Sequence, residues 1–219
     1  MVRVAVVLSG CGGKDGSEIN ESVLTLLALD QQGAQVTAFA PNRAQTVVKN
    51  HLTGEVVSET RNMQVEACRF VREGVRPLSE AHAQDFDALI VPGGYGAALN
   101  LSNFATAGAQ AVMLPELNDL LCQFRDQKKP VGFICIAPHL IPMVYPKGAR
   151  LTVGCDPDTS ATLRSMGAET IDCGPQDIVV DPIHRIVSTP AYMVGKRISE
   201  VAMGITQLVT AVLTMAKNK

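Results

Sequence analysis

The chain has 219 residues, of which 47% are hydrophobic and 18% are charged. This length suits one large domain or two small ones, and such a chain buries enough surface to hold its core without a disulfide or a metal. The net charge of −2 argues against a nucleic-acid-binding surface, because such domains usually carry a basic excess. Aromatic residues make up only 4% and Trp is absent, which argues against stacking platforms for bases or sugars.

The cysteines indicate a compartment rather than a motif. Widely scattered cysteines in a chain of this size are typical of a reducing compartment, and the absence of a Cys-x-x-Cys pair excludes zinc-ribbon and thioredoxin-type motifs. The apolar stretch Val4–Leu8 is too short for the hydrophobic core of a signal sequence. No apolar run approaches the roughly 20 residues of a membrane span, so we expect a cytoplasmic protein. The six cysteines are Cys11, Cys68, Cys122, Cys135, Cys155 and Cys173.

The chain begins with an almost continuous apolar run, Val2–Leu8, which is rich in β-branched residues and typical of a strand covered on both faces. Glycines between positions 10 and 16 end this strand, and a helix with one apolar stripe follows and ends near Gly33. The residues of the stripe are Ile19, Val23, Leu26 and Leu27. Further strands are predicted at 35–40, 88–91, 131–134 and 151–153, helices at 59–69, 116–126, 159–165 and about 195–216, and a hairpin from 178–180 and 186–188.

Strands that alternate with helices imply right-handed crossovers and a mostly parallel sheet between two layers of helices. No internal repeat, low-complexity tract or linker is evident, so we predict a single α/β domain over residues 1–219. Ligands of such folds bind beyond the carboxyl ends of the strands. The segments that follow strands are therefore the candidate site, namely 10–18, 92–100, 135–139 and 154–158.

The clearest local signal is Gly132–Pro138, in which an apolar strand delivers Cys135 and a small residue follows two positions later. This pattern resembles a nucleophile elbow, although Phe133 and Ala137 occupy the positions of its two glycines. A thiol at a helix N-terminus faces unpaired N–H groups, which lower its pKa, so we expect a depressed Cys135 pKa. The alternative is a buried cysteine at a strand end that only packs.

Glycines also follow the predicted strand at 88–91, in the sequence Pro92-Gly93-Gly94. Glycines in this position allow the backbone to approach a ligand closely. The N–H groups of Gly94 and Ile136 are candidates to stabilise an oxyanion near Cys135. The alternative is an ordinary turn that opens a helix.

The glycine-rich segment 9–18 matches neither the dinucleotide-binding fingerprint nor a phosphate-binding P-loop in its spacing. Glu18 lies at the start of the first predicted helix, beside the strand ends, where a carboxyl group could act as a general acid or base. The local alternative is a helix capping box formed by Asp15 and Glu18, and the local sequence alone favours this reading.

The four histidines fit hydrolytic triads poorly. His139 lies one turn beyond Cys135, and His184 falls in the predicted hairpin without a nearby glutamate in the spacing of a glutamine amidotransferase. His51 and His82 lie in polar segments. Metal-ligand spacing is absent, so we expect no metal site.

Several segments match a known family when they are taken together. They are Val7–Gly12, Asp15–Ile19, His51–Gly54, Glu59–Asn62, Val91–Gly94, Asn100–Phe104, Phe133–Pro138 and Thr189–Met193. In this combination the chain resembles the ElbB-type proteins, also called enhancing lycopene biosynthesis protein 2 or sigma cross-reacting protein. That family belongs to the ThiJ/PfpI superfamily, which is related in fold to class I glutamine amidotransferases.

The resemblance implies a flavodoxin-like three-layer sandwich with a nucleophile elbow, usually as a homodimer. It implies an elbow cysteine, here Cys135, paired with a carboxylic acid of the first helix, here Glu18, which reverses the local preference for a cap. It places the oxyanion donors at Gly94 and Ile136. It also implies a cofactor-independent glyoxalase that converts glyoxal to glycolate, or a protein deglycase, whereas the lycopene name records an effect on isoprenoid yield.

Two positions depart from the family pattern. Many relatives in the superfamily carry a histidine after the strand that corresponds to 151–153, whereas this chain has Gly154-Cys155-Asp156. A Cys–His hydrolase is therefore disfavoured. Asn20 also stands where close relatives often carry histidine.

The sequence thus predicts a glyoxalase-type enzyme that acts on small 2-oxoaldehydes. The Cys135 thiolate adds to the aldehyde and Glu18 moves the protons, with no cofactor, metal, nucleic acid or membrane involved. Two alternatives stay open: a redox-sensing or stress-response protein that uses the same thiol without turnover, and a hydrolase of amides or peptides. A histidine within reach of Cys135 would be required for the hydrolase.

Overall fold

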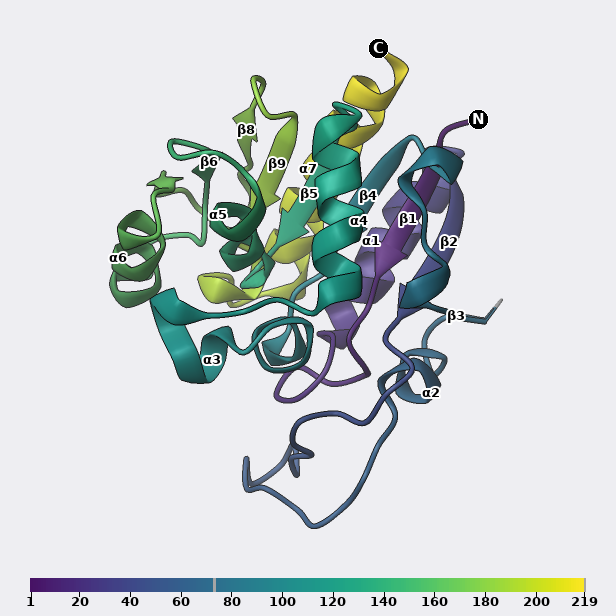
Figure 1. Cartoon of the computed structure of the whole chain (residues 1–219), viewed down its shortest axis with the longest axis vertical. Helices are drawn as coiled ribbons and strands as arrows, with labels where there is room; N and C mark the ends of the chain where they lie inside the picture. The colour runs from purple at the N-terminus through teal and green to yellow at the C-terminus, as the bar shows by residue number, and fades with distance from the viewer. Residues whose placement is uncertain (73, 219) are drawn as a thin grey trace.

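The computed structural model describes residues 1–72 and 74–218 (Figure 1). Within these residues a seven-stranded sheet has the order β3-β2-β1-β4-β5-β9-β8. Neighbouring strands are parallel except β8, which pairs antiparallel with β9. This confirms the flavodoxin-like α/β fold and the hairpin near the C-terminus. The strands are β1 (Arg3–Val7), β2 (Gln35–Ala40), β3 (Arg76–Pro77), β4 (Ala88–Val91), β5 (Val131–Ile134), β8 (Val179–Asp181) and β9 (Ile186–Thr189).

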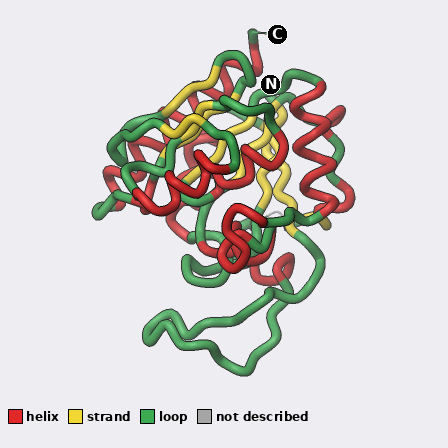
Figure 2. The backbone as a smooth tube through the Cα atoms, turned by 60° about the vertical axis from the view of Figure 1, so that its left-hand side comes forward, coloured by secondary structure: helices red, strands yellow, loops and turns green. Residues whose placement is uncertain are grey.

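Helices cover both faces of this sheet, as Figures 1 and 2 show. Helices α1 (Ile19–Gln31) and α7 (Ile198–Lys217) pack against each other on one face. Helices α4 (Pro115–Asp126) and α5 (Ile141–Val144) lie on the other. Successive residues of β1 alternate between the two resulting cores, as the pleat of a strand requires, and this produces the predicted three layers.

Two predicted elements differ in extent. The predicted helix at 59–69 shortens to α2 (Met63–Ala67), because the Asn62 side chain accepts hydrogen bonds from the N–H groups of Gln64 and Val65 and so caps the helix there. The predicted strand at 151–153 is the short β6 (Arg150–Leu151), which pairs with β7 (Glu169–Thr170) outside the main sheet. The remaining helices are α3 (Phe104–Ala107) and α6 (Pro157–Ser165).

The first helix buries a different face from the one that its apolar stripe predicts. Ile19, Val23 and Leu27 are 45%, 43% and 47% exposed. Its buried residues are instead Glu21, Ser22, Thr25, Ala28 and Leu29. Small and polar side chains therefore face the rest of the protein along the N-terminal part of α1, where the helix approaches the ends of the strands.

Helix α7 contradicts the expectation that no apolar segment reaches the length of a membrane span. It has 20 residues, an 18-residue stretch of which has a mean hydropathy of 1.5, and it meets that criterion by length and composition. Its apolar side, however, packs against β5 and β9. A core helix of this length has the same composition, so α7 is explained by its place in the fold.

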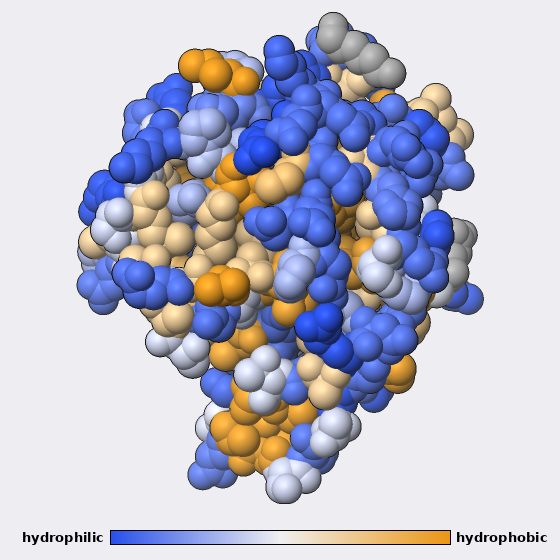
Figure 3. All heavy atoms as spheres, in the orientation of Figure 1, coloured by the Kyte–Doolittle hydropathy of each residue, from blue (hydrophilic) through white to orange (hydrophobic). Residues whose placement is uncertain are grey.

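A long arm, defined here as residues 41–62, projects from the body between β2 and α2 (Figures 1 and 2). It doubles back on itself through an isolated bridge between Lys49 and Val56. Leu52 is 92% exposed and Val56 is 66% exposed. Figure 3 shows hydrophobic surface at this end of the molecule. The arm begins where β2 ends, on the same edge of the sheet as the elbow after β5.

Candidate active site

The predicted elbow is present at the end of β5. Cys135 has φ of +62°, a conformation that residues other than glycine rarely adopt. Its N–H donates to the carbonyl oxygen of Thr189 at 2.9 Å, which holds the turn against β9. Such a backbone typically costs about 1–3 kcal/mol and persists where the surrounding structure fixes it. A short 3₁₀ turn, Ala137–Leu140, follows in place of the expected regular helix.

Glu21 provides the carboxyl group that lies against the Cys135 thiol. The two side chains interact through a hydrogen bond, and Glu21 has no exposed surface. Glu21 also accepts hydrogen bonds from the N–H of Gly93 at 3.1 Å and from the N–H of Tyr192 at 3.3 Å. Burial, followed by the nearby charge of Glu18, raises the pKa of Glu21 to about 8. This carboxyl group therefore carries a proton at neutral pH.

Glu18 occupies a different position from the predicted one. Its Oε2 accepts a hydrogen bond from the N–H of Glu21 at 2.7 Å, so that it caps α1. Burial raises its pKa, but the carboxyl group in contact with Cys135 belongs to Glu21. The reason is helical phase: α1 begins at Ile19, so Glu18 precedes the helix and the buried side of the first turn falls on Glu21. The cap also differs from the predicted capping box, since Asp15 lies outside it.

The structure brings the predicted donors Gly94 and Ile136 to the Cys135 sulfur. Both backbone N–H groups hydrogen-bond to this sulfur and lower its pKa. Gly93 and Gly94 permit this approach, because a Cβ on Gly93 would overlap Cys135 and Glu21, and a Cβ on Gly94 would overlap the backbone of Glu18. Gly94 also has φ of +96°. Their role as oxyanion donors stays a prediction.

The thiol has the opposite pKa shift from the expected one. Burial, followed by the charge of Glu21, raises the pKa of Cys135, and the two N–H groups only partly offset this. The expectation of a depressed thiol pKa is wrong because a short buried turn replaces the exposed helix N-terminus on which it depended. Cys135 and Glu21 thus form a coupled pair whose proton losses belong to both groups.

None of the four histidines, all of which lie in the described part of the chain, hydrogen-bonds to Cys135. In buried His139, Nδ1 pairs with the carbonyl of Ile136 and Nε2 with Ser102 Oγ, both at 2.7 Å. Its ring stacks on Phe104, and burial lowers its pKa to about 4, so it is neutral. His184 pairs with Asp181 in the turn between β8 and β9. This arrangement provides no Cys–His pair for a hydrolase.

Two more side chains complete the surroundings of Glu21. Asn20 Nδ2 donates to the Tyr192 hydroxyl at 3.0 Å, and the Tyr192 backbone holds Glu21 as described above. Asn20 therefore ties α1 to the segment that follows β9. The sequence assigned no role to Tyr192, although it follows a predicted strand and lies in the segment Thr189–Met193 that contributes to the family resemblance.

The described residues hold no group of three or more His, Cys, Asp or Glu side chains that could bind a metal ion. A cleft of about 750 Å³ lies between the C-terminal part of α1, the first residues of β2 and residues 70–72 and 74–76. Its lining includes Leu26, Phe70 and Arg72 but neither Cys135 nor Glu21, so it is separate from the elbow. The predicted independence from cofactors stays a prediction.

The fold and the elbow define the class of protein. Residues 6–188 match the model of the DJ-1/PfpI family, and the chain belongs to that family. The resemblance found in the sequence is thereby confirmed at the level of the superfamily.

Particular relatives narrow this further. The chain is 38% identical to the rat ES1 protein homolog, mitochondrial, over 97% of this chain and 84% of that protein. It is 36% identical to the human glutamine amidotransferase-like class 1 domain-containing protein 3, mitochondrial, over 97% and 83%. A solved Ehrlichia chaffeensis isoprenoid biosynthesis protein with an amidotransferase-like domain superposes with a TM-score of 0.90 at 34% identity, covering 98% of this chain and all of that one.

The expectation of a cytoplasmic location is contradicted by these relatives. The rat, human and zebrafish proteins that match are all named as mitochondrial. Scattered free cysteines indicate reducing conditions, which do not single out the cytoplasm. The cysteine pattern was therefore too weak an observation to assign a compartment.

Proposed function

We propose that the protein is a cofactor-independent glyoxalase-type enzyme that converts glyoxal or related 2-oxoaldehydes to hydroxy acids. One observation carries the proposal: a thiol, a proton-bearing carboxyl group and two backbone donors meet at a buried, strained turn. Membership of a family built around this elbow supports a reactive cysteine. The carboxyl partner in the proposal is Glu21, in place of Glu18.

The reaction balances with these groups alone. The Cys135 sulfur bonds to one aldehyde carbon of glyoxal, and the proton that leaves the thiol passes to the carbonyl oxygen, which gives a hemithioacetal. Glu21 as a carboxylate removes the proton from that carbon, which leaves an enediolate. The hydroxyl proton of this carbon passes to the second oxygen, and Glu21 returns the proton it holds to the neighbouring carbon. The product is a thioester of glycolate. Water then hydrolyses the thioester, releasing glycolate and the free thiol.

The raised pKa of Glu21 suits this exchange. A group whose pKa lies near the working pH is present in both protonation states and can both donate and accept a proton. The N–H groups of Gly94 and Ile136 would stabilise the negative oxygen that develops during addition and hydrolysis. Removal of one such donor typically lowers a rate by about 100-fold or more.

Steady-state formation of glycolate from glyoxal, in a buffer without primary amines, tests the proposal. We expect Cys135→Ala to abolish turnover and Glu21→Gln to lower kcat by about 100-fold or more, a typical effect of removing a general acid–base. Glu18→Gln is the matched control, since it changes a neighbouring carboxyl group that caps the helix, and it should keep kcat within a few-fold. Undiminished turnover in Cys135→Ala would refute the mechanism.

The same experiment separates the enzyme from a redox sensor. A wild-type protein that forms no glycolate, but accumulates stoichiometric sulfinate on Cys135 after mild peroxide treatment, would support a sensing role. If kcat falls as much in Glu18→Gln as in Glu21→Gln, the proton transfer would have to be assigned to Glu18 as well.

A further inference from the structure

We propose that Tyr192 is a positioning residue: Asn20 fastens it to α1, and its backbone N–H then holds the carboxyl group of Glu21 in place. For turnover the inference rests on the proposed function, whereas its structural part concerns the protonation of Glu21 itself. The contacts that carry it join the first turn of α1, the elbow after β5 and the turn after β9. These three segments lie far apart in the sequence.

Tyr192 contacts two consecutive residues of α1, one with its hydroxyl group and one with its backbone. Asn20 Nδ2 donates a hydrogen bond to the Tyr192 hydroxyl at 3.0 Å. The N–H of Tyr192 donates to Glu21 Oε1 at 3.3 Å. Because the two contacts attach one residue to α1 at two separate points, the first limits the displacement that the second, longer contact would otherwise allow.

The turn that presents Tyr192 has an unusual backbone. Ala191, which directly precedes it, has φ of +43°, a conformation that residues other than glycine rarely adopt. The peptide group between Ala191 and Tyr192 carries the N–H that bonds to Glu21, so this conformation sets the direction of the N–H. Ala191 is fully buried, and its carbonyl oxygen accepts hydrogen bonds from the N–H groups of Val194 at 3.3 Å and Gly195 at 2.8 Å. The surrounding structure therefore holds the turn in this conformation.

The same segment also holds the elbow. The carbonyl oxygen of Thr189, two residues before Ala191, accepts a hydrogen bond from the N–H of Cys135 at 2.9 Å. Glu21 and Cys135 are thus both attached to the short stretch between Thr189 and Tyr192, and their side chains hydrogen-bond to each other. A displacement of this stretch would alter the contact between the thiol and the carboxyl group, on which the proposed proton exchange depends.

The two backbone donors to Glu21 differ in how they are fixed. The N–H of Gly93 bonds to Oε2 at 3.1 Å, and Gly93 is fixed by crowding, because a Cβ would not fit there. The donor to Oε1 belongs to the short 3₁₀ turn Ala191–Met193, which Asn20 secures to α1. Burial raises the pKa of Glu21 to about 8, and both N–H groups partly offset this rise. Loss of the contact between Asn20 and Tyr192 should therefore raise the pKa of Glu21 further.

The carbon-13 resonance of the Glu21 carboxyl group, followed against pH, measures this effect without turnover, and Glu21→Gln assigns the resonance by removing it. In the wild type we expect a midpoint at about pH 8. Tyr192→Phe, which keeps the ring that packs against the core, and Asn20→Ala should each raise the midpoint by about 0.5 pH unit or more. The double variant should show no larger rise than the larger single one, since both changes remove one contact. An unchanged midpoint in either single variant, or rises that add in the double variant, would overturn the proposal.

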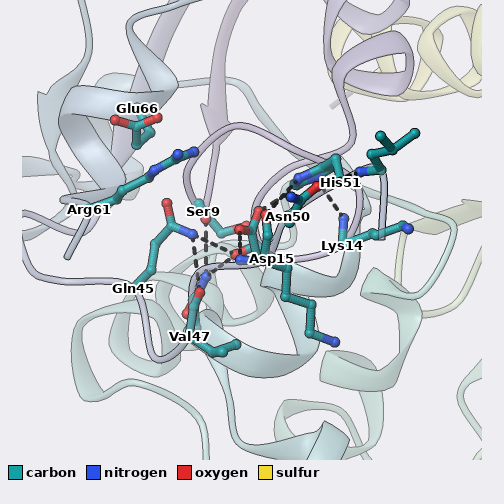
Figure 4. Close-up of polar contacts among 12 residues, drawn as sticks. Ser9, Lys14, Asp15, Gln45, Val47, Asn50, His51, Arg61 and Glu66 are labelled. Atoms are coloured by element: carbon teal, nitrogen blue, oxygen red, sulfur yellow. Dashed lines mark hydrogen bonds and ion pairs between the residues drawn. The ribbon is translucent and has the colours of Figure 1, made fainter. Parts of the chain in front are cut away.

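Two matched controls separate this contact from the general effect of the same substitutions. Tyr145→Phe removes a buried hydroxyl group that has no hydrogen-bond partner among the described residues. Asn50→Ala changes the arm (Figure 4), where the Asn50 side-chain oxygen accepts hydrogen bonds from the N–H groups of Leu52 and Thr53. Both variants should keep the wild-type midpoint. An equal rise in either control would show that the midpoint responds to any such substitution, and the proposal would fail.

Turnover provides the second measurement. For glyoxal we expect Tyr192→Phe to lower kcat about five-fold with little change in KM, and to move the pH dependence of kcat upward by the same interval as the carbon-13 midpoint. If glyoxal is not turned over but the midpoint rises in both single variants, the positioning of Glu21 stands and the proposed function fails. If glyoxal is turned over and the midpoint stays at the wild-type value, the proposed function stands and Tyr192 has no positioning role.

Discussion

The carboxyl group of Glu21 hydrogen-bonds to the thiol of Cys135, and both residues are buried. The pair joins the first turn of α1 to the elbow after β5, two elements more than 100 residues apart in the sequence. Burial disfavours the charged form of each group, so the folded protein retains protons that the unfolded chain would lose. Stability and reactivity are therefore coupled through the same two side chains.

Glu21 should make the wild-type protein less stable as the pH rises. In the unfolded chain the pKa of its carboxyl group is about 4.3, whereas its pKa in the folded protein is about 8. Between these values the folded state binds the extra proton, so the free energy of unfolding falls by up to ~1.4 kcal/mol per pH unit. Glu21→Gln lacks this titration and should show a flatter dependence. Urea unfolding at pH 5, 6, 7 and 8 measures the difference.

The control for this prediction is Glu55→Gln, which removes an exposed carboxyl group from the arm. Its stability should follow the wild-type pH dependence. Parallel curves for wild type and Glu21→Gln would show that Glu21 is ionised in the folded protein at neutral pH. The protonated form of Glu21 that the proposed proton exchange requires would then be absent at neutral pH.

Gly94 should tolerate alanine much less well than another glycine with a similar backbone. Gly94 and Gly33 have φ of +96° and +70°, so alanine is strained at both positions. A Cβ at Gly94 would overlap the backbone of Glu18, whereas nothing lies within 4 Å of a Cβ at Gly33. We expect Gly33→Ala to cost about 1 kcal/mol and Gly94→Ala to cost at least ~2 kcal/mol more from overpacking. Equal losses in thermal unfolding would contradict this account of the close approach.

The sequence located the elbow because its signal is local. A short apolar strand followed directly by Cys135 can be read from a few adjacent residues, and the parallel sheet then places Gly94 beside it. The carboxyl partner depends on helical phase, which is a tertiary property. Apolar Ile19 and Val23 suggested an inward face that in fact lies outside. Glu21 is an ionisable residue on the opposite face of the helix, and it could have been recognised as the carboxyl partner of Cys135. That inference required knowing which face of α1 packs against the protein.

The arm was not predicted, because residues 41–58 have neither the period of a strand nor that of a helix, and its last residues were assigned to the helix predicted at 59–69. It is held by side-chain contacts to Asp15 and Asn100, which connect residues far apart in the chain. The polar residues of a loop sequence do not indicate which distant residues their side chains will contact. The buried position of Asp15 could be recognised only from the structure.

Ser102 should contribute to stability through His139. Ser102→Ala would leave the buried Nε2 of His139 without its partner, and an unsatisfied buried polar atom costs about 1–3 kcal/mol. Ser160 is the matched control, because its buried hydroxyl has no hydrogen-bond partner, so Ser160→Ala should be nearly neutral. Chemical unfolding of both variants checks the difference. A neutral Ser102→Ala would show that the imidazole does not depend on this hydroxyl.

The outer face of α1 should mediate the predicted homodimer. Ile19, Val23 and Leu27 follow one another at intervals of four residues and form an exposed apolar stripe. A second copy of the chain can cover such a stripe symmetrically, as in most homodimers. We expect a dimer mass for the wild type by light scattering and a monomer mass for Val23→Glu. Val112→Glu, which introduces the same charge at a position 69% exposed and outside the stripe, should stay dimeric. A wild-type monomer at micromolar concentrations, or a dimeric Val23→Glu variant, would contradict the prediction that the outer face of α1 forms the dimer interface.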